Sequence, residues 1–188
     1  MSEQAERIYE RLLVVRAQAG DEAAFAELVE RFSPKLRYFL RKLLASADGA
    51  EDALQDVWLE VFRGLARLED PQAMVAWLYR IARDRAYARL RKARRLELSL
   101  DETAVMEPTT EAEKEFSAED AASIHAGLDA LPAQQREVLV LRFLEEMSYE
   151  EIAKVVGCNV GTVRSRIHYA KRALRERVQS SGFTQPNE

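Results

Sequence analysis

The chain has 188 residues, 47% of them hydrophobic, which suits one or two domains with a buried core. Gly and Pro are scarce whereas Ala, Leu, Glu and Arg dominate, and this composition predicts an all-α protein. No apolar run reaches about 18 residues and the N-terminus lacks a signal-peptide pattern, so a membrane span is excluded and a cytoplasmic location is expected. The single cysteine excludes an internal disulfide, and no residue pattern indicates a metal or another cofactor.

The net charge of −4 conceals a strong segregation of charge along the chain. Residues 77–95 carry eight Arg and Lys against one Asp, a local charge of +7, and residues 160–178 carry six against one, a charge of +5. Between them, residues 97–123 hold nine Asp and Glu against one Lys, a charge of −8. Two basic stretches separated by an acidic one are typical of a protein that contacts nucleic acid at two places.

The first part of the chain predicts a helical core in which no chemistry is visible. Residues 1–11 are polar and are expected to fray, a short helix follows over residues 12–19, and Asp21 caps the next helix. Ser33-Pro34 is expected to break that helix, because the residue before a proline avoids helical backbone. A third helical stripe continues over residues 36–43.

Residues 48–65 predict a long amphipathic helix whose acidic start complements the positive end of the helix dipole. The predicted buried stripe consists of Leu54, Val57, Trp58, Val61, Phe62 and Leu65. The polar flank consists of Glu51, Asp52, Gln55, Asp56 and Glu60. From the residues alone, this flank either binds a partner or serves only the helix dipole and solubility.

A loop over residues 65–71 leads into a helix over residues 72–95, with Pro71 suited to its first turn. The outward side of that helix is dense in Arg and also carries Tyr87. Arg with interleaved aromatic rings suits phosphates and unstacked bases, each stacked base contributing about 1–3 kcal/mol. Trp77 fits this role, but it fits the hydrophobic core equally well.

Residues 96–127 are acidic and weakly periodic, which predicts a linker between two small helical domains. The first domain is expected over residues 12–95 and the second over residues 128–178, followed by a polar tail over residues 179–188. In the second domain, a helix after Leu131-Pro132 is expected to pack on a pair of shorter helices, because two short helices alone cannot bury a core.

That pair of helices carries the sharpest local signal in the chain. Ser148 and Glu151 have the spacing of a capping box, Gly157 can end the first helix in left-handed backbone, and Asn159 can cap the second. The second helix has a buried stripe through Val163 and is basic on its other faces. This pattern predicts a helix-turn-helix, and an ordinary helical hairpin with a solvated basic face is the alternative.

Taken together, the chain resembles a bacterial sigma-70 family RNA polymerase sigma factor of the extracytoplasmic-function (ECF) type. The resemblance covers residues 12–178 and is carried by four stretches: GDEAAFAELVERF, DGAEDALQDVWLEVFR, WLYRIARDRAYARLRKARR and LPAQQREVLVLRFLEEMSYEEIAKVVGCNVGTVRSRIHYAKRALRE. It implies a promoter-specificity subunit with no chemistry of its own, which binds core RNA polymerase and promoter DNA and is often held by an anti-sigma factor.

The resemblance also implies a role for three sets of residues. The acidic flank would dock on the clamp coiled coil of core RNA polymerase through Glu51, Asp52, Gln55, Asp56 and Glu60. The promoter's −10 element would be bound and melted by Arg67, Glu69, Asp70, Trp77, Arg80, Arg83, Asp84, Tyr87, Arg91 and Arg94. The −35 element would be read by Thr162, Arg164, Ser165, His168, Lys171 and Arg172. The acidic linker would thread toward the polymerase's RNA path.

One position departs from the family pattern: Asp84 stands where an Asn is common after WLYRIAR. A carboxylate there either alters −10 readout by repelling phosphate or pairs with a neighbouring Arg. Two other functions compete with the sigma factor. An ordinary repressor or activator would leave the basic aromatic helix unexplained, and a scaffold built on the acidic helix would leave both basic helices unexplained. Isolated His125 and His168 indicate no catalytic pair, so an enzyme is not expected.

Overall fold

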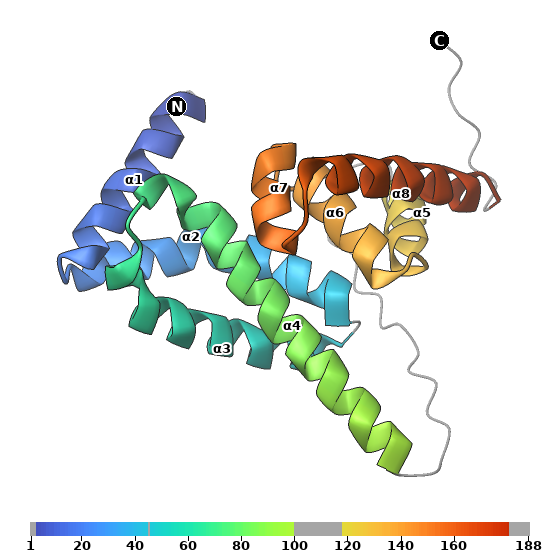
Figure 1. The fold of residues 1–188 in the computed structure, drawn as a ribbon, viewed down its shortest axis with the longest axis horizontal. Coiled ribbons are helices and arrows are strands. Elements are labelled where there is room, and N and C mark those ends of the chain that lie inside the picture. The colour runs from blue at the N-terminus through green and yellow to red at the C-terminus, as the bar shows by residue number, and fades with distance from the viewer. Residues whose placement is uncertain (1–2, 45, 100–117, 181–188) are drawn as a thin grey trace.

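A computed structural model describes residues 3–44, 46–99 and 118–180, and in these ranges every regular element is a helix (Figure 1). The first domain comprises α1 (Glu3–Gln18), α2 (Glu22–Leu44), α3 (Ala47–Gly64), two short 3-10 turns (Leu65–Arg67 and Pro71–Ala73) and α4 (Met74–Ser99). The second domain comprises α5 (Ala118–Asp129), α6 (Ala133–Phe143), α7 (Tyr149–Val156) and α8 (Val160–Ser180). The all-α fold with two helical domains is confirmed.

The core of the first domain is built around α2, which packs against α1, α3 and α4. Its fully buried side chains include Leu28 and Phe39 of α2, Val57 of α3 and Tyr79 of α4. The rings of Phe39 and Tyr79 meet edge to face with centroids 5.3 Å apart. This packing fixes α3 and α4 side by side, so the acidic and the basic aromatic helix share one rigid frame (Figure 1).

Two sequence predictions about this domain are wrong. The first helix begins at Glu3, not at residue 12, because its polar start does have a partner face: Tyr9 donates to Glu27 at 3.1 Å and lies under the Arg31 guanidinium. The second helix runs unbroken through Pro34. A proline inside a helix costs about 3 kcal/mol, and here the buried stripe that continues on both sides of it offsets that cost.

The acidic stretch predicted as a linker is partly helical, because α5 begins at Ala118 within it; residues 100–117 lie outside the described residues. Gly127 lets α5 approach α8 closely, since a Cβ at this position would lie 2.8 Å from a Leu174 methyl carbon. Arg136 of α6, which is almost completely buried, donates to the carbonyl oxygens of Leu128 and Asp129 at the C-terminal end of α5.

The helix-turn-helix is confirmed in its details. Ser148 Oγ accepts from the Glu151 amide at 3.2 Å, while Glu151 Oε2 accepts from the Ser148 amide at 2.7 Å, which completes the capping box. Gly157 has φ of 69°, the left-handed conformation that glycine adopts without strain. Asn159 Oδ1 then accepts from the Thr162 amide at 2.8 Å and caps α8.

Replacing Ser148 with Ala is expected to lower the free energy of unfolding of the second domain by about 1 kcal/mol, because one helix donor loses its acceptor. Urea denaturation followed by circular dichroism measures this loss. Ser165→Ala is the matched control, since Ser165 is exposed in the interior of α8 and caps nothing. Equal effects of the two substitutions would contradict the capping role.

Candidate nucleic-acid interface

The acidic flank of α3 is largely paired with basic residues of α4. Arg89 binds Asp56 at 2.7 Å and Asp52 at 3.5 Å, and Arg85 forms a short salt bridge with Glu60. These carboxylates remain between 43% and 67% exposed, so they are still open to a partner. The pairing turns two arginines of the basic helix toward α3, and they are therefore not available on the opposite face of α4.

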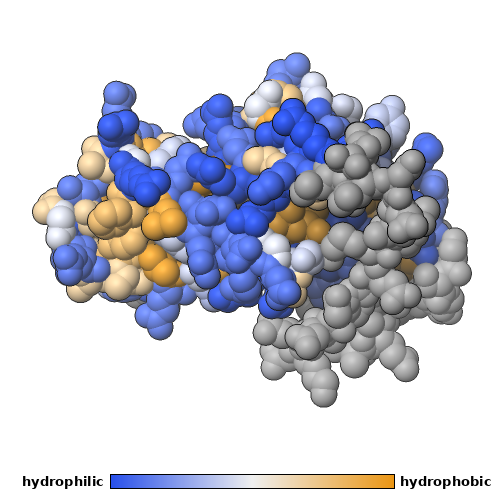
Figure 2. Space-filling model, turned by 90° about the horizontal axis from the view of Figure 1, so that it is seen from below, coloured by the Kyte–Doolittle hydropathy of each residue, from blue (hydrophilic) through white to orange (hydrophobic). Residues whose placement is uncertain are grey.

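An exposed apolar patch continues the acidic flank toward the end of α3 (Figure 2). Leu59 is 54% exposed and Phe62 is 69% exposed, with the Phe62 ring 5.4 Å from that of Phe25. The prediction that Phe62 is buried is therefore wrong. A sequence signal was present, because Gln55, Leu59 and Phe62 follow Asp52 at helical spacings of three and four. We call these four residues together with Asp56 the α3 stripe.

The remaining predicted docking residue, Glu51, lies on the neighbouring side of α3. It accepts from Arg37 Nε of α2 at 2.6 Å, and Arg41 lies 3.8 Å away. Gln55 is exposed and stands between the two paired regions. The five predicted docking residues therefore share one helix, but four of them also hold α3 to α2 or α4 through ion pairs.

The predicted −10 residues on α4 fall into an exposed and a half-buried group. Arg80, Asp84, Arg91 and Arg94 are exposed. Asp84 Oδ1 lies 3.8 Å from the Arg83 guanidinium, so the carboxylate that replaces the common Asn pairs with the adjacent Arg. This contact agrees with the interpretation in which the Asp84 carboxylate pairs with a neighbouring Arg.

Arg83 and Tyr87 form the half-buried group, and a carboxylate of the second domain covers them. Arg83 Nε donates to Glu137 Oε2 at 3.0 Å, and its guanidinium lies 4.6 Å from the centroid of the Tyr87 ring. Glu137 is 0% exposed, and burial raises the pKa of its carboxyl group above the ordinary value. Burial also raises the pKa of Tyr87 to about 12. No sequence pattern indicated this contact between the domains.

The loop before α4 is held in place by a side chain of α1. Gln18 Nε2 donates to the carbonyl oxygens of Leu65 and Leu68 at 2.9 and 2.7 Å. Asp70 caps the second 3-10 turn, accepting from the Gln72 amide at 2.9 Å. The predicted −10 residues of this loop are all exposed: Arg67, Glu69 and Asp70.

Trp77 lies at the edge of the core beside this loop. It is half-buried, and its ring packs on Gly64 so closely that a Cβ at Gly64 would lie 2.9 Å from ring atom Cζ2. The core reading of Trp77 is therefore supported by its packing. Its contact with Gly64, the last residue of α3, also places the ring next to the start of the loop.

The predicted −35 residues gather on the solvent side of α8. Thr162 is half-buried at the helix start, where its hydroxyl bonds to Asn159 Oδ1. The side chains that follow are exposed: Arg164, Ser165, His168, Lys171 and Arg172. Val163, Ile167 and Ala170 are buried on the opposite side, as predicted. A basic helix held by its apolar side and open on the other has the form that enters a major groove.

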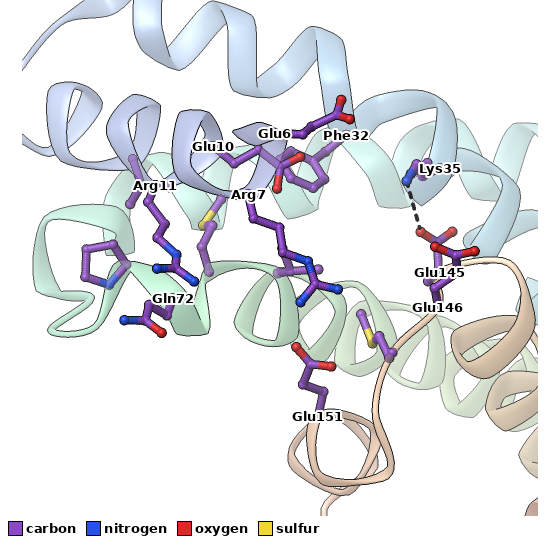
Figure 3. A pocket seen from close by; sticks show the side chains of 15 residues that line it. Glu6, Arg7, Glu10, Arg11, Phe32, Lys35, Gln72, Glu145, Glu146 and Glu151 are labelled. Atoms are coloured by element: carbon purple, nitrogen blue, oxygen red, sulfur yellow. Dashed lines mark ion pairs between the residues drawn. The ribbon is translucent and has the colours of Figure 1, made fainter. Parts of the chain in front are cut away.

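A cavity of about 360 Å³ lies where α1, α2 and α4 meet the loop between α6 and α7 (Figure 3). Its walls carry both signs of charge, with Lys35 Nζ 4.0 Å from Glu145. Burial raises the pKa of Glu145 and of Glu10. Within residues 3–44, 46–99 and 118–180, no group of His, Cys, Asp and Glu is placed to hold a metal ion, and no helix is long and apolar enough to cross a membrane.

Comparisons with known proteins identify the family of the chain. The family model "Sigma-70 region 2" matches residues 28–96, and the model "Sigma-70, region 4" matches residues 121–174. The ECF RNA polymerase sigma-E factor of Escherichia coli (strain K12) is 34% identical over 186 residues, which cover 93% of this chain and 97% of that protein. The RNA polymerase sigma-H factor of Pseudomonas aeruginosa is 33% identical over 178 residues, with 89% and 92% covered.

Two solved structures share the fold. CnrH, in complex with the cytosolic domain of CnrY, has a TM-score of 0.67 and 28% identity over 91% of this chain and 97% of its own. The sigma factor RpoE of Bartonella quintana, in complex with the anti-sigma factor NepR, has a TM-score of 0.67 and 28% identity over 82% of this chain and 96% of its own. The chain therefore belongs to the sigma-70 family, within the ECF sigma factors, which bind core RNA polymerase and direct it to promoters.

Proposed function

We propose that the chain divides its task among three surfaces and supplies no chemistry of its own. The α3 stripe binds core RNA polymerase, α4 with the loop before it binds and opens the −10 element, and α8 reads the −35 element. The observation that carries this proposal is that the three surfaces lie on different helices and that each exposes a group of charged side chains, with Trp77, Arg83 and Tyr87 of α4 half-buried. Such a protein acts in the cytoplasm, beside the polymerase and the chromosome.

The α3 stripe suits a protein partner rather than DNA. It combines exposed carboxylates with two exposed apolar side chains, Leu59 and Phe62, and DNA phosphates would repel the first and gain nothing from the second. Phe62 adds a large apolar contact at the end of the acidic flank. We therefore include Leu59 and Phe62 with the five docking residues predicted from the sequence.

The α4 surface suits a single strand that has left the duplex. Arg80, Arg91 and Arg94 are exposed along the helix and can follow phosphates, while the loop over residues 65–70 presents both polar side chains and a rigid backbone. A loop held firmly beside a basic helix can retain a base that has flipped out of the stack. This retention would stabilise the melted strand.

We further propose that an anti-sigma factor controls the chain, as NepR binds the Bartonella quintana sigma factor with the same fold. The likeness to that complex supports a partner of this class.

Run-off transcription with purified core RNA polymerase tests the proposed function. Promoters from the chain's own genome should yield specific transcripts only when this protein is added. Tight binding of the free protein to duplex operators without any transcripts would contradict the proposal.

Replacing Arg172 with Ala is expected to weaken recognition of the −35 element by about 1–3 kcal/mol, because an exposed Arg on a recognition helix can bind a base edge with both donors. The ranking of promoters in the run-off assay measures the effect. Lys154→Ala removes the same charge from the exposed side of α7 and should leave that ranking unchanged. An identical promoter profile for both variants would remove Arg172 from the base-reading set.

A further inference from the structure

The first helix, α1, exposes a row of large apolar side chains. Ile8 is 58% exposed, and Leu12 and Val15 are each 50% exposed. The helix lies at the edge of the first domain and packs on α2 and the two 3-10 turns through its other side, where Leu13 and Val14 are buried (Figure 1). Neighbouring apolar side chains that remain exposed in a folded protein mark a surface that binds a partner.

The row has the heptad spacing of a coiled coil. Steps of four and three residues separate Ile8, Leu12 and Val15, and Ala5 and Ala19 continue the pattern by one step at each end. All five side chains are exposed. Such alternating steps form the narrow seam along which one helix packs against another, whereas a helix that packs on a core has an apolar face at least about 100° wide. We call these five residues the α1 seam.

The charges beside the α1 seam are positive. Arg11 and Arg16 occupy the positions that flank a heptad seam on its two sides. Arg11 is exposed where the seam borders the cavity described above (Figure 3). Arg16 binds Asp21 at 2.6 Å but remains 46% exposed. The other flanking positions between residues 4 and 18 hold uncharged side chains: Gln4, Tyr9 and Gln18.

These charges disfavour a second copy of the chain as the partner. In a parallel pair of α1 helices, Arg11 of each copy would face Arg16 of the other, because flanking residues that meet lie five positions apart. In an antiparallel pair, residues of the same flank meet, and neither flank offers an opposite charge. A partner helix with Asp or Glu at its flanking positions would instead pair with both arginines.

We propose that the α1 seam binds an amphipathic helix of a partner protein, with apolar residues at heptad spacing and Asp or Glu beside them. The seam shares no residue with the α3 stripe or with the residues assigned to the −10 and −35 elements. A protein bound there can therefore accompany the chain in transcription, because it does not take the place of the polymerase or the promoter.

A designed helical peptide serves as the probe. It has four heptads, with Ile and Leu at the two seam positions of each heptad and Glu at both flanking positions, and it carries fluorescein. A second peptide with Lys in place of Glu is the matched control. Anisotropy measures the binding of each peptide to the full-length protein. The Glu peptide should bind at least about tenfold more tightly than the Lys peptide, because the charge pairs with both arginines change sign between them.

Three substitutions in the protein locate the binding. Leu12→Glu should weaken binding of the Glu peptide at least about tenfold, because it places a carboxylate in the middle of the seam. Leu144→Glu makes the same change at an exposed leucine of the second domain and should have no effect. Arg11→Glu exchanges one exposed charge and should shift the preference toward the Lys peptide. Melting temperatures near that of the wild type establish that each variant is folded.

The natural partner is mapped by photo-cross-linking in the cells that make the protein. The photoreactive amino acid p-benzoylphenylalanine replaces residue 15, and mass spectrometry identifies the cross-linked segment of the partner. The expected segment has apolar residues at heptad spacing with Asp or Glu beside them. A cross-linked segment without this pattern would contradict the proposal.

Other outcomes would also overturn it. Equal affinity of the wild type for the two peptides would remove the role of the arginines, and unchanged binding by Leu12→Glu would remove the seam. Binding to vesicles of phosphatidylglycerol and phosphatidylcholine, without binding to either peptide, would make the seam a lipid surface. Leu12→Glu should support run-off transcription as the wild type does, and loss of transcripts would place the seam in the polymerase interface. Wild-type transcription tests the sigma role independently of the seam.

Discussion

Reversing the charge of Asp52 and Asp56 to Lys is expected to lower the affinity for core RNA polymerase by at least about 100-fold. Each close charge pair at an interface contributes roughly 1.5 kcal/mol or more, and a reversed charge adds repulsion to the loss. Both carboxylates are exposed on the α3 stripe, so a partner can reach them. Affinity is measured with immobilised core enzyme and labelled protein.

The structure adds a control that the sequence alone would not have suggested. Both carboxylates bind Arg89, so their reversal also places like charges between α3 and α4. Adding Arg89→Glu to the variant that carries Asp52→Lys and Asp56→Lys should restore the pairing between α3 and α4 and the melting temperature. It should not restore polymerase binding. Reversal of Glu22 and Glu30, exposed acidic residues of α2, makes the same net change away from the stripe. If the variant with all three substitutions binds core RNA polymerase as tightly as the wild type does, docking through this flank is refuted.

Local signals in the sequence predicted the second domain well. The capping box at Ser148, the left-handed Gly157 and the cap at Asn159 each depend on residues within three or four positions of one another. The stability of each of these helix ends therefore depends on residues that are close together in the sequence. The same holds for the stripe of α8, where spacing alone identified the buried and the exposed sides.

Contacts between distant elements could not be predicted in this way. No sequence pattern distinguishes Glu137 from a surface carboxylate, and its pairing with Arg83 depends on the contact between the two domains. The pairing of Arg85 with Glu60 likewise depends on two helices lying side by side. The number of Arg and Lys in a basic segment is therefore larger than the number of cations that remain available to DNA.

The misplacement of Phe62 has a different origin. An apolar residue at a helical spacing from Trp58 was assigned to the core, although the spacing from Leu59 and Gln55 placed it equally well on the outer stripe. Periodicity specifies that residues share a side of the helix, and it does not specify which side is covered. Packing of α3 against α2 and α4 decided this, leaving Phe62 exposed beside the carboxylates.

Replacing Gly64 with Ala is expected to lower the free energy of unfolding by about 1–3 kcal/mol, the usual cost of overpacking. Gly64 has φ of −102° and ψ of −19°, a conformation open to any residue, so backbone strain does not contribute. The cost arises because a Cβ would lie 2.9 and 3.3 Å from Cζ2 and Cη2 of Trp77. Urea denaturation measures it.

A double-mutant cycle with Trp77→Phe isolates that contact. The smaller ring lacks the outer indole atoms that meet the new methyl group, so Gly64→Ala should cost less than about 0.5 kcal/mol in this background. An equal cost in both backgrounds would show that the ring is not the obstacle.

Permanganate footprinting of promoter complexes then separates the two readings of Trp77. If the indole supports the loop that holds the melted strand, Gly64→Ala should reduce promoter opening even at temperatures where the variant remains fully folded. Gln18 still fixes the loop's two carbonyls in this variant, so the loss would come from the displaced ring. A destabilised variant with normal opening would leave Trp77 as a core residue only, and the −10 surface would then consist of the exposed loop and the cations of α4.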